Sequence, residues 1–130
     1  MSGGVDGRVK DVANQFQRVL EDINREGGFS WSLLVTEEGL PIAWAPGVSE
    51  VENASAMVAL LGRVSTRIRK ELALGTLEEI TIRTADRDLL VCWPVELGKD
   101  VIILGVLVPP DTSYRRVANR AVARIRALVV

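Results

Sequence analysis

The chain has 130 residues, 48% hydrophobic and 25% charged, which is the composition of a globular protein and not of a disordered one. It contains neither the ~20 consecutive apolar residues of a membrane-spanning helix nor the apolar core of a secretory signal, so we expect one cytoplasmic domain covering residues 1–130. The net charge of −1, from 16 basic and 17 acidic residues, gives no overall field that would attract nucleic acid or draw the protein to a membrane.

The chain begins with a predicted helix followed by a β-hairpin. Apolar residues recur every three or four positions from Val5 to about Glu26, and the glycine pair that follows ends this helix. Residues 29–35 and 40–44 are typical of two strands that are joined by a turn at Gly39. Because Pro41 cannot donate a ladder hydrogen bond, we expect the second of these strands at a sheet edge.

A second long helix is predicted for residues 49–74. Ser49 is a candidate N-cap, Glu52 lies in the capping-box position, and Gly75 is the expected stop signal. This helix separates the N-terminal hairpin from the remaining strands.

Three strands and a final helix complete the chain. The strands cover residues 77–84, 89–95 and 101–108, and the last is apolar on both faces, which favours a central position. The final helix, residues 112–129, carries Val117, Ala118, Ala121, Ile125 and Leu128 on one side and arginines on the other. The order α-β-β-α-β-β-β-α predicts an α+β fold in which helices cover an antiparallel sheet.

Residues for catalysis and metal binding are scarce. The chain has no histidine, which removes the commonest general base and transition-metal ligand, and its one cysteine, Cys92, lies in an apolar strand where a buried, inert thiol is expected. The paired acids at 37–38, 78–79 and 86/88 lie beside turns or strand ends, where solvation explains them. We therefore expect a protein without catalytic residues, cofactor or metal, and not an enzyme.

Three segments resemble the Roadblock dynein light-chain family: residues 32–42, which include Glu38-Gly39-Leu40-Pro41-Ile42, the small-residue helix segment Ala54–Leu61, and the strand Ile102–Leu107. The resemblance covers nearly the whole chain. It implies a Roadblock-like five-stranded antiparallel sheet and a homodimer or heterodimer that joins third strands and stacks second helices. It also implies a scaffold or regulator of small Ras-like GTPases.

The second helix has two different sides. A helical wheel gives a large apolar side, which we expect to be buried, formed by Met57, Leu61, Val64, Ile68 and Leu72. The other side is small at one end and basic at the other, and it carries Ala56, Ala59, Gly62, Arg63, Thr66, Arg67 and Lys70. Small residues allow a second backbone to approach, and Gly62 costs ~1 kcal/mol in a helix, so a partner helix is favoured over a solvated alanine-rich surface.

We therefore predict a dimer interface made by the small side of this helix and by the strand 77–84. Its residues are Ala56, Ala59, Gly62, Thr66, Glu79, Thr81 and Arg83. The strand has ladder groups that a twin strand would satisfy, and Glu79 and Arg83 could pair across a two-fold axis. A homodimer is the simplest assembly, and a heterodimer with a related chain stays open.

The basic end of the helix is the candidate partner-binding site. Arg63, Arg67 and Lys70 could meet acidic groups of a Ras-like GTPase, although a solvated stripe explains them equally well. Arg87 is expected to be held by its neighbours Asp86 and Asp88.

The leading hypothesis is a non-enzymatic regulatory adaptor of the bacterial gliding-motility type, which could stimulate GTP hydrolysis by positioning the partner's own groups. Two alternatives remain: a scaffold subunit without GTPase contact, and a PAS- or GAF-like sensor, which would need a polar-lined cavity on the sheet.

Overall fold

The computed structural model describes residues 12–45 and 47–129. In these residues three helices and five strands follow one another in the predicted order. Their bounds are α2 Ala13–Gly27, β1 Trp31–Thr36, β2 Pro41–Trp44, α3 Val51–Glu71, β3 Ile80–Arg83, β4 Leu89–Leu97, β5 Asp100–Val108 and α4 Arg115–Val129. The N-terminal part of the predicted first helix, residues 5–11, lies outside the described residues.

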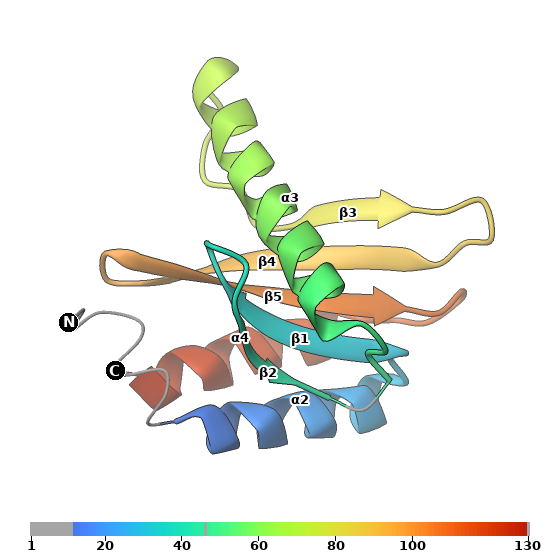
Figure 1. The fold of residues 1–130 in the computed structure, drawn as a ribbon. Coiled ribbons are helices and arrows are strands. Elements are labelled where there is room, and N and C mark those ends of the chain that lie inside the picture. Colours follow the sequence, from blue (N-terminus) through green and yellow to red (C-terminus); the bar gives the residue numbers. More distant parts are fainter. Residues whose placement is uncertain (1–11, 46, 130) are drawn as a thin grey trace.

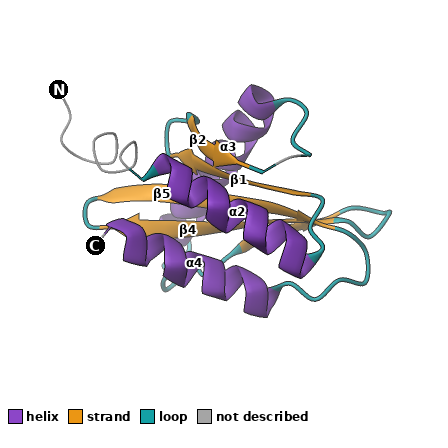
Figure 2. Ribbon diagram, turned by 90° about the horizontal axis from the view of Figure 1, so that it is seen from below, coloured by secondary structure: helices purple, strands orange, loops and turns teal. Residues whose placement is uncertain are grey.

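The sheet is fully antiparallel with the strand order β2-β1-β5-β4-β3, and helices cover both of its faces. Figure 1 shows α3 crossing one face, whereas Figure 2 shows α2 and α4 side by side on the other. The central position of β5 and the edge position of β2, which contains Pro41, confirm the sequence predictions. The other edge is β3, which pairs only with β4 among the residues that the structure describes.

Each sheet face has its own apolar core. The larger core lies under α2 and α4, and the predicted inner side of α4, with Ala118, Ala121 and Ile125 fully buried, belongs to it. The smaller core lies under α3 and contains Leu33, Val35, Val58, Ala59, Cys92 and Ile103. Because β5 contributes to both cores, its residues are apolar on both faces, which explains the unbroken apolar run.

The end of α2 agrees with the sequence prediction, but both ends of α3 differ from it. Gly28 ends α2 in the left-handed conformation, with φ of 67°, as a glycine at that position should. In contrast, α3 begins at Val51 after Glu50, and no side chain caps its first turn, so the assignment of Ser49 as N-cap is wrong. It ends at Glu71, four residues before the predicted stop at Gly75. The C-terminal end is closed locally, because Ala73 adopts a left-handed backbone with φ of 54° and the N–H groups of Ala73 and Leu74 donate to the carbonyls of Lys70 and Arg69.

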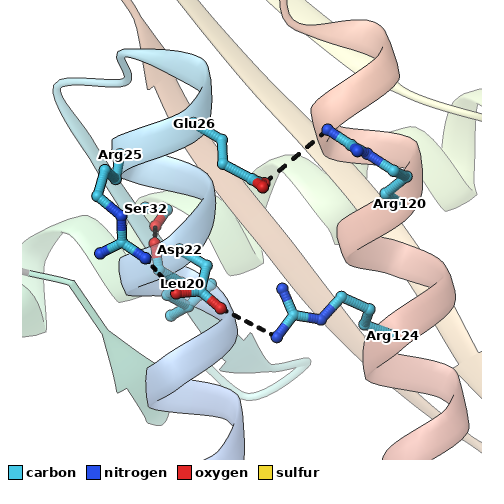
Figure 3. A network of polar contacts seen from close by, with 7 residues as sticks. All are labelled: Leu20, Asp22, Arg25, Glu26, Ser32, Arg120 and Arg124. Atoms are coloured by element: carbon cyan, nitrogen blue, oxygen red, sulfur yellow. Dashed lines mark hydrogen bonds and ion pairs between the residues drawn. The ribbon is translucent and has the colours of Figure 1, made fainter.

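Ion pairs join α2 to α4 on the solvent side (Figure 3). Asp22 accepts from Arg124 at 3.1 Å and from Arg25 at 2.6 Å, and Glu26 lies 3.9 Å from Arg120. The hydrogen bond from Arg124, followed by that from Arg25, lowers the pKa of Asp22 below its ordinary value of 3.8. Two of the outward arginines of α4 thus form exposed ion pairs with α2, above the apolar core that the two helices share.

No helix in residues 12–45 and 47–129 is both long enough and apolar enough to cross a membrane.

Candidate functional site

The helix α3 rests on the sheet through its small residues. Its buried residues are Ser55, Val58, Ala59, Gly62 and Ser65. A Cβ atom added at Gly62 would lie only 2.6 Å from Cδ1 of Ile103, and one added at Gly105 of β5 would lie 2.9 Å from Val58. One glycine on the helix and one on the strand therefore allow an approach that larger residues would prevent.

The large apolar side of α3 consequently faces solvent. The prediction that Met57, Val64, Ile68 and Leu72 are buried is wrong, because Met57 is 54% exposed and Leu72 is 65% exposed. Of the predicted inner residues only Leu61 is half-buried, against the smaller core. We call the exposed residues Met57, Leu60, Val64, Ile68 and Leu72 the outer stripe. A row of this size is unusual on a lone protomer and indicates a covered surface.

The predicted small-residue interface on α3 is largely occupied within the chain. Ala59 and Gly62 are buried against the sheet, so they cannot contact a second helix. Ala56 is exposed but lies beside the β1–β2 turn, where a Cβ at Gly39 would be 3.5 Å from its Cα. Thr66 is exposed and donates its hydroxyl to the carbonyl of Gly62 at 3.1 Å. Small residues on this helix thus serve packing inside the protomer.

The three predicted partner-binding cations lie together on one flank of α3, but only one of them has a hydrogen-bond partner within the described part of the protomer. Arg63 donates to the backbone carbonyl of Glu37 at 2.8 Å and so ties the helix to the β1–β2 turn. Arg67 and Lys70 are exposed, and neither forms an ion pair with another described residue. The two free cations therefore lie beside the outer stripe, on the last turns of the helix.

At the β3 edge the predicted residues Glu79, Thr81 and Arg83 lie on the side of α4. The Oε2 atom of Glu79 accepts from the hydroxyls of Tyr114 and Thr81, each at 3.0 Å, and lies 3.6 Å from Arg115. Burial, followed by the bond to Glu79, raises the pKa of Tyr114. Arg83 is exposed and has no hydrogen-bond or ion-pair partner among the described residues.

Two further side chains were assigned from the sequence. Arg87 pairs with Asp111 at 2.5 Å, in the loop before α4, and not with its neighbours Asp86 and Asp88, so that prediction is wrong. Its left-handed backbone, with φ of 74°, belongs to the β3–β4 turn. Cys92 is fully buried as predicted, and burial raises the pKa of its thiol to about 12, which keeps it protonated and inert.

Most of the chain is similar to known proteins. Residues 15–107 match the Roadblock/LC7 domain. Two uncharacterized proteins of Methanocaldococcus jannaschii are each 27% identical over 113 residues, which cover 85% of this chain and 96% of each relative.

Two solved structures have the same fold. Myxococcus xanthus MglB superposes with a TM-score of 0.76 at 17% identity, over 91% of this chain and 92% of that one. The gliding protein MglB of Thermus thermophilus gives 0.73 at 19% identity, over 99% and 93%. The domain match, which spans most of the chain, and this fold together show that the protein belongs to the Roadblock/LC7 family.

Proposed function

We propose that this chain forms a dimer that binds a Ras-like small GTPase in the cytosol and regulates it without catalytic chemistry of its own. The observation that carries the proposal is the outer stripe of α3. Its large apolar side chains are exposed to solvent in the protomer and belong to neither of the two apolar cores. Membership of the Roadblock/LC7 family supports it, because the family resemblance implies dimers that serve small GTPases.

The two sheet edges support dimerisation through β3. The outer edge of β2 is closed, because Pro41 has no N–H and the N–H of Trp44 donates to Oε1 of Gln17 at 3.1 Å. In residues 12–45 and 47–129 no side chain satisfies a backbone group of β3. A twin strand is the simplest partner for such an open edge.

The position of α3 supports the same dimer. Its last turns extend past the β3 edge (Figure 1), and residues 66–76 are exposed throughout. At the other end of β3 an apolar row crosses the sheet on the α3 side, through the register pairs of Ile82 with Leu90, Leu90 with Leu107, and Leu107 with Trp31. A two-fold axis at β3 would bring the overhanging helix of each copy over the row of the other and cover both surfaces.

The GTPase would contact the paired helices through their basic flanks. Arg67 and Lys70 are the free cations there, and they would meet acidic groups of the GTPase in a rim contact that speeds association. Arg63 is committed to the β1–β2 turn and would act by fixing the shape of this surface. Any stimulation of GTP hydrolysis would then come from positioning groups of the GTPase itself.

The dimer is tested by sedimentation equilibrium at micromolar concentration, where two chains of 14.2 kDa should give about 28 kDa. Ile68→Lys places a charge in the outer stripe without touching either core, so the variant should fold and sediment as a monomer. Leu40→Lys is the matched control, because Leu40 is exposed in the β1–β2 turn, and this variant should remain dimeric. A monomeric wild type, or a dimeric Ile68→Lys variant, would refute this interface.

GTPase binding is tested with the Ras-like GTPases of the same genome, each loaded with GDP and with a non-hydrolysable GTP analogue. For a GTPase that binds, the variant with Arg67→Glu and Lys70→Glu should associate at least about tenfold more slowly at low salt. The control changes Arg116 and Arg126 of α4, on the opposite sheet face, to glutamate and should associate normally. If no GTPase binds in either state, the scaffold-subunit function replaces this one.

A further inference from the structure

The outer edge of β3 carries a symmetric pattern of side chains. Ile80 pairs with Cys92 and Ile82 with Leu90, so both isoleucines lie on the α3 side of the sheet. Thr81 and Arg83 lie on the α4 side, together with Glu79, which accepts from Thr81 and from Tyr114. Thr81 is therefore flanked by an isoleucine on each side. The next residue outward is the acid Glu79 in one direction and the base Arg83 in the other.

Both charged residues of this pattern have side-chain atoms that can form further hydrogen bonds or ion pairs in the protomer. All described contacts of Glu79 are made through Oε2, which leaves Oε1 to accept a further donor. Arg83 has no hydrogen-bond or ion-pair partner among the described residues, although it is exposed on the same side. An acid with an open oxygen and a base without a partner thus lie two residues on either side of Thr81.

We infer that β3 pairs with β3 of a second copy about a two-fold axis at Thr81, and that this register makes the chain select itself as its partner. The inference rests on the proposed dimer and adds its register and its specificity. Thr81 lies opposite Thr81 of the second copy, Ile80 opposite its Ile82, and Glu79 opposite its Arg83. Each pair matches in chemistry, and the charge pair occurs twice because of the symmetry.

The neighbouring registers do not match. Residues directly opposite in an antiparallel pair point to the same sheet face, so the centre of symmetry can move only from Thr81 to Ile80 or to Ile82. A centre at Ile82 places Arg83 opposite Thr81 and Glu79 opposite Ala85, which lies past the end of β3. A centre at Ile80 places Glu79 opposite Thr81 and Arg83 opposite Leu77. Both alternatives lose the two ion pairs and one or both apolar pairs.

The consequence is selectivity for a second copy of this chain. A related chain that lacks an acid and a base at these positions would leave Glu79 or Arg83 facing a neutral or like-charged residue. In the self-paired dimer, the second copy instead adds its Arg83 to the cluster of Glu79, Tyr114 and Arg115, which is incomplete in one protomer.

Disulfide cross-linking tests the register. Cα atoms of directly opposite residues are about 4.5–5.5 Å apart, which a disulfide can span. Thr81→Cys should therefore form a cross-linked dimer under mild oxidation. The wild type is the control, because its single Cys92 is buried and should not cross-link. Ile80→Cys and Ile82→Cys should each fail alone but cross-link when mixed. Self-cross-linking of Ile82→Cys or Ile80→Cys, without that of Thr81→Cys, would overturn the register.

Charge reversal tests the selectivity. Arg83→Glu should weaken self-association by about tenfold, because it places two acids against each other twice. Lys99→Glu is the control, since Lys99 is an exposed cation in the β4–β5 turn, and it should leave self-association unchanged. Glu79→Arg should also weaken self-association, but a mixture of Glu79→Arg with Arg83→Glu should form heterodimers in which both charge pairs are restored.

The outcomes separate this inference from the proposed function. If the wild type is monomeric, the proposed dimer itself fails. Suppose instead that the wild type is a dimer and that Ile68→Lys disrupts it. If Thr81→Cys then fails to cross-link, and the mixture of Glu79→Arg with Arg83→Glu forms no heterodimer, only the register and the selectivity are wrong.

Discussion

Replacing Gly62 with alanine distinguishes the observed orientation of α3 from the one that its helical wheel favoured. In a helix interior, Gly→Ala alone stabilises by about 1 kcal/mol. Here the new Cβ would lie 2.6 Å from Cδ1 and 3.2 Å from Cγ1 of Ile103, a side chain that is only 1% exposed and cannot move into solvent. Overpacking of this kind costs about 1–3 kcal/mol. The net change expected for Gly62→Ala is therefore a loss of about 0–2 kcal/mol.

A double-mutant cycle isolates the contact. Ile103→Val removes Cδ1 and by itself should cost about 0.5–1.5 kcal/mol. In the Gly62→Ala background it also relieves the clash, so it should cost nothing or stabilise, which gives a coupling of about 1 kcal/mol. The assay is urea unfolding followed by tryptophan fluorescence at one fixed protein concentration, because dimerisation makes stability concentration-dependent. Additive changes, or stabilisation by the full amount of about 1 kcal/mol in Gly62→Ala, would show that Gly62 does not face the sheet.

Three further outcomes are expected. Because Arg124 and Arg25 lower the pKa of Asp22, its contribution to stability should be present above pH 3.8 and lost as the pH falls through the lowered pKa; Asp22→Asn should remove this part of the acid transition in pH-dependent unfolding curves. The thiol of Cys92 should react with a chromogenic disulfide reagent only on unfolding, and rapid labelling of the native protein would contradict its burial. Arg63→Ala should speed amide hydrogen exchange at residues 37–40, because it removes the bond to Glu37, whereas equal exchange would mean that the bond does not hold the turn.

The sequence alone determined most of the fold. The apolar periodicity of α2 and α4 predicted their inner sides, since each of these helices has one apolar side and one polar side. The two-faced apolar run of β5 predicted the centre of the sheet, and Pro41 predicted an edge, because burial on both faces and the loss of a ladder donor are local properties. The inert character of Cys92 followed from its apolar neighbours in the same way.

Only the tertiary structure decided which side of α3 meets the sheet. Its wheel separates a large apolar side from a small one, and a rule that buries the larger side is reasonable for a protomer that folds alone. The small side is buried instead, because Gly62 meets Ile103 and Val58 meets Gly105, contacts that depend on how closely two backbones approach. Arg63 and Arg87 likewise bond to residues 26 and 24 positions away. Periodicity records which residues share a face, but the distance between a helix and a sheet is fixed by pairs of residues far apart in the chain.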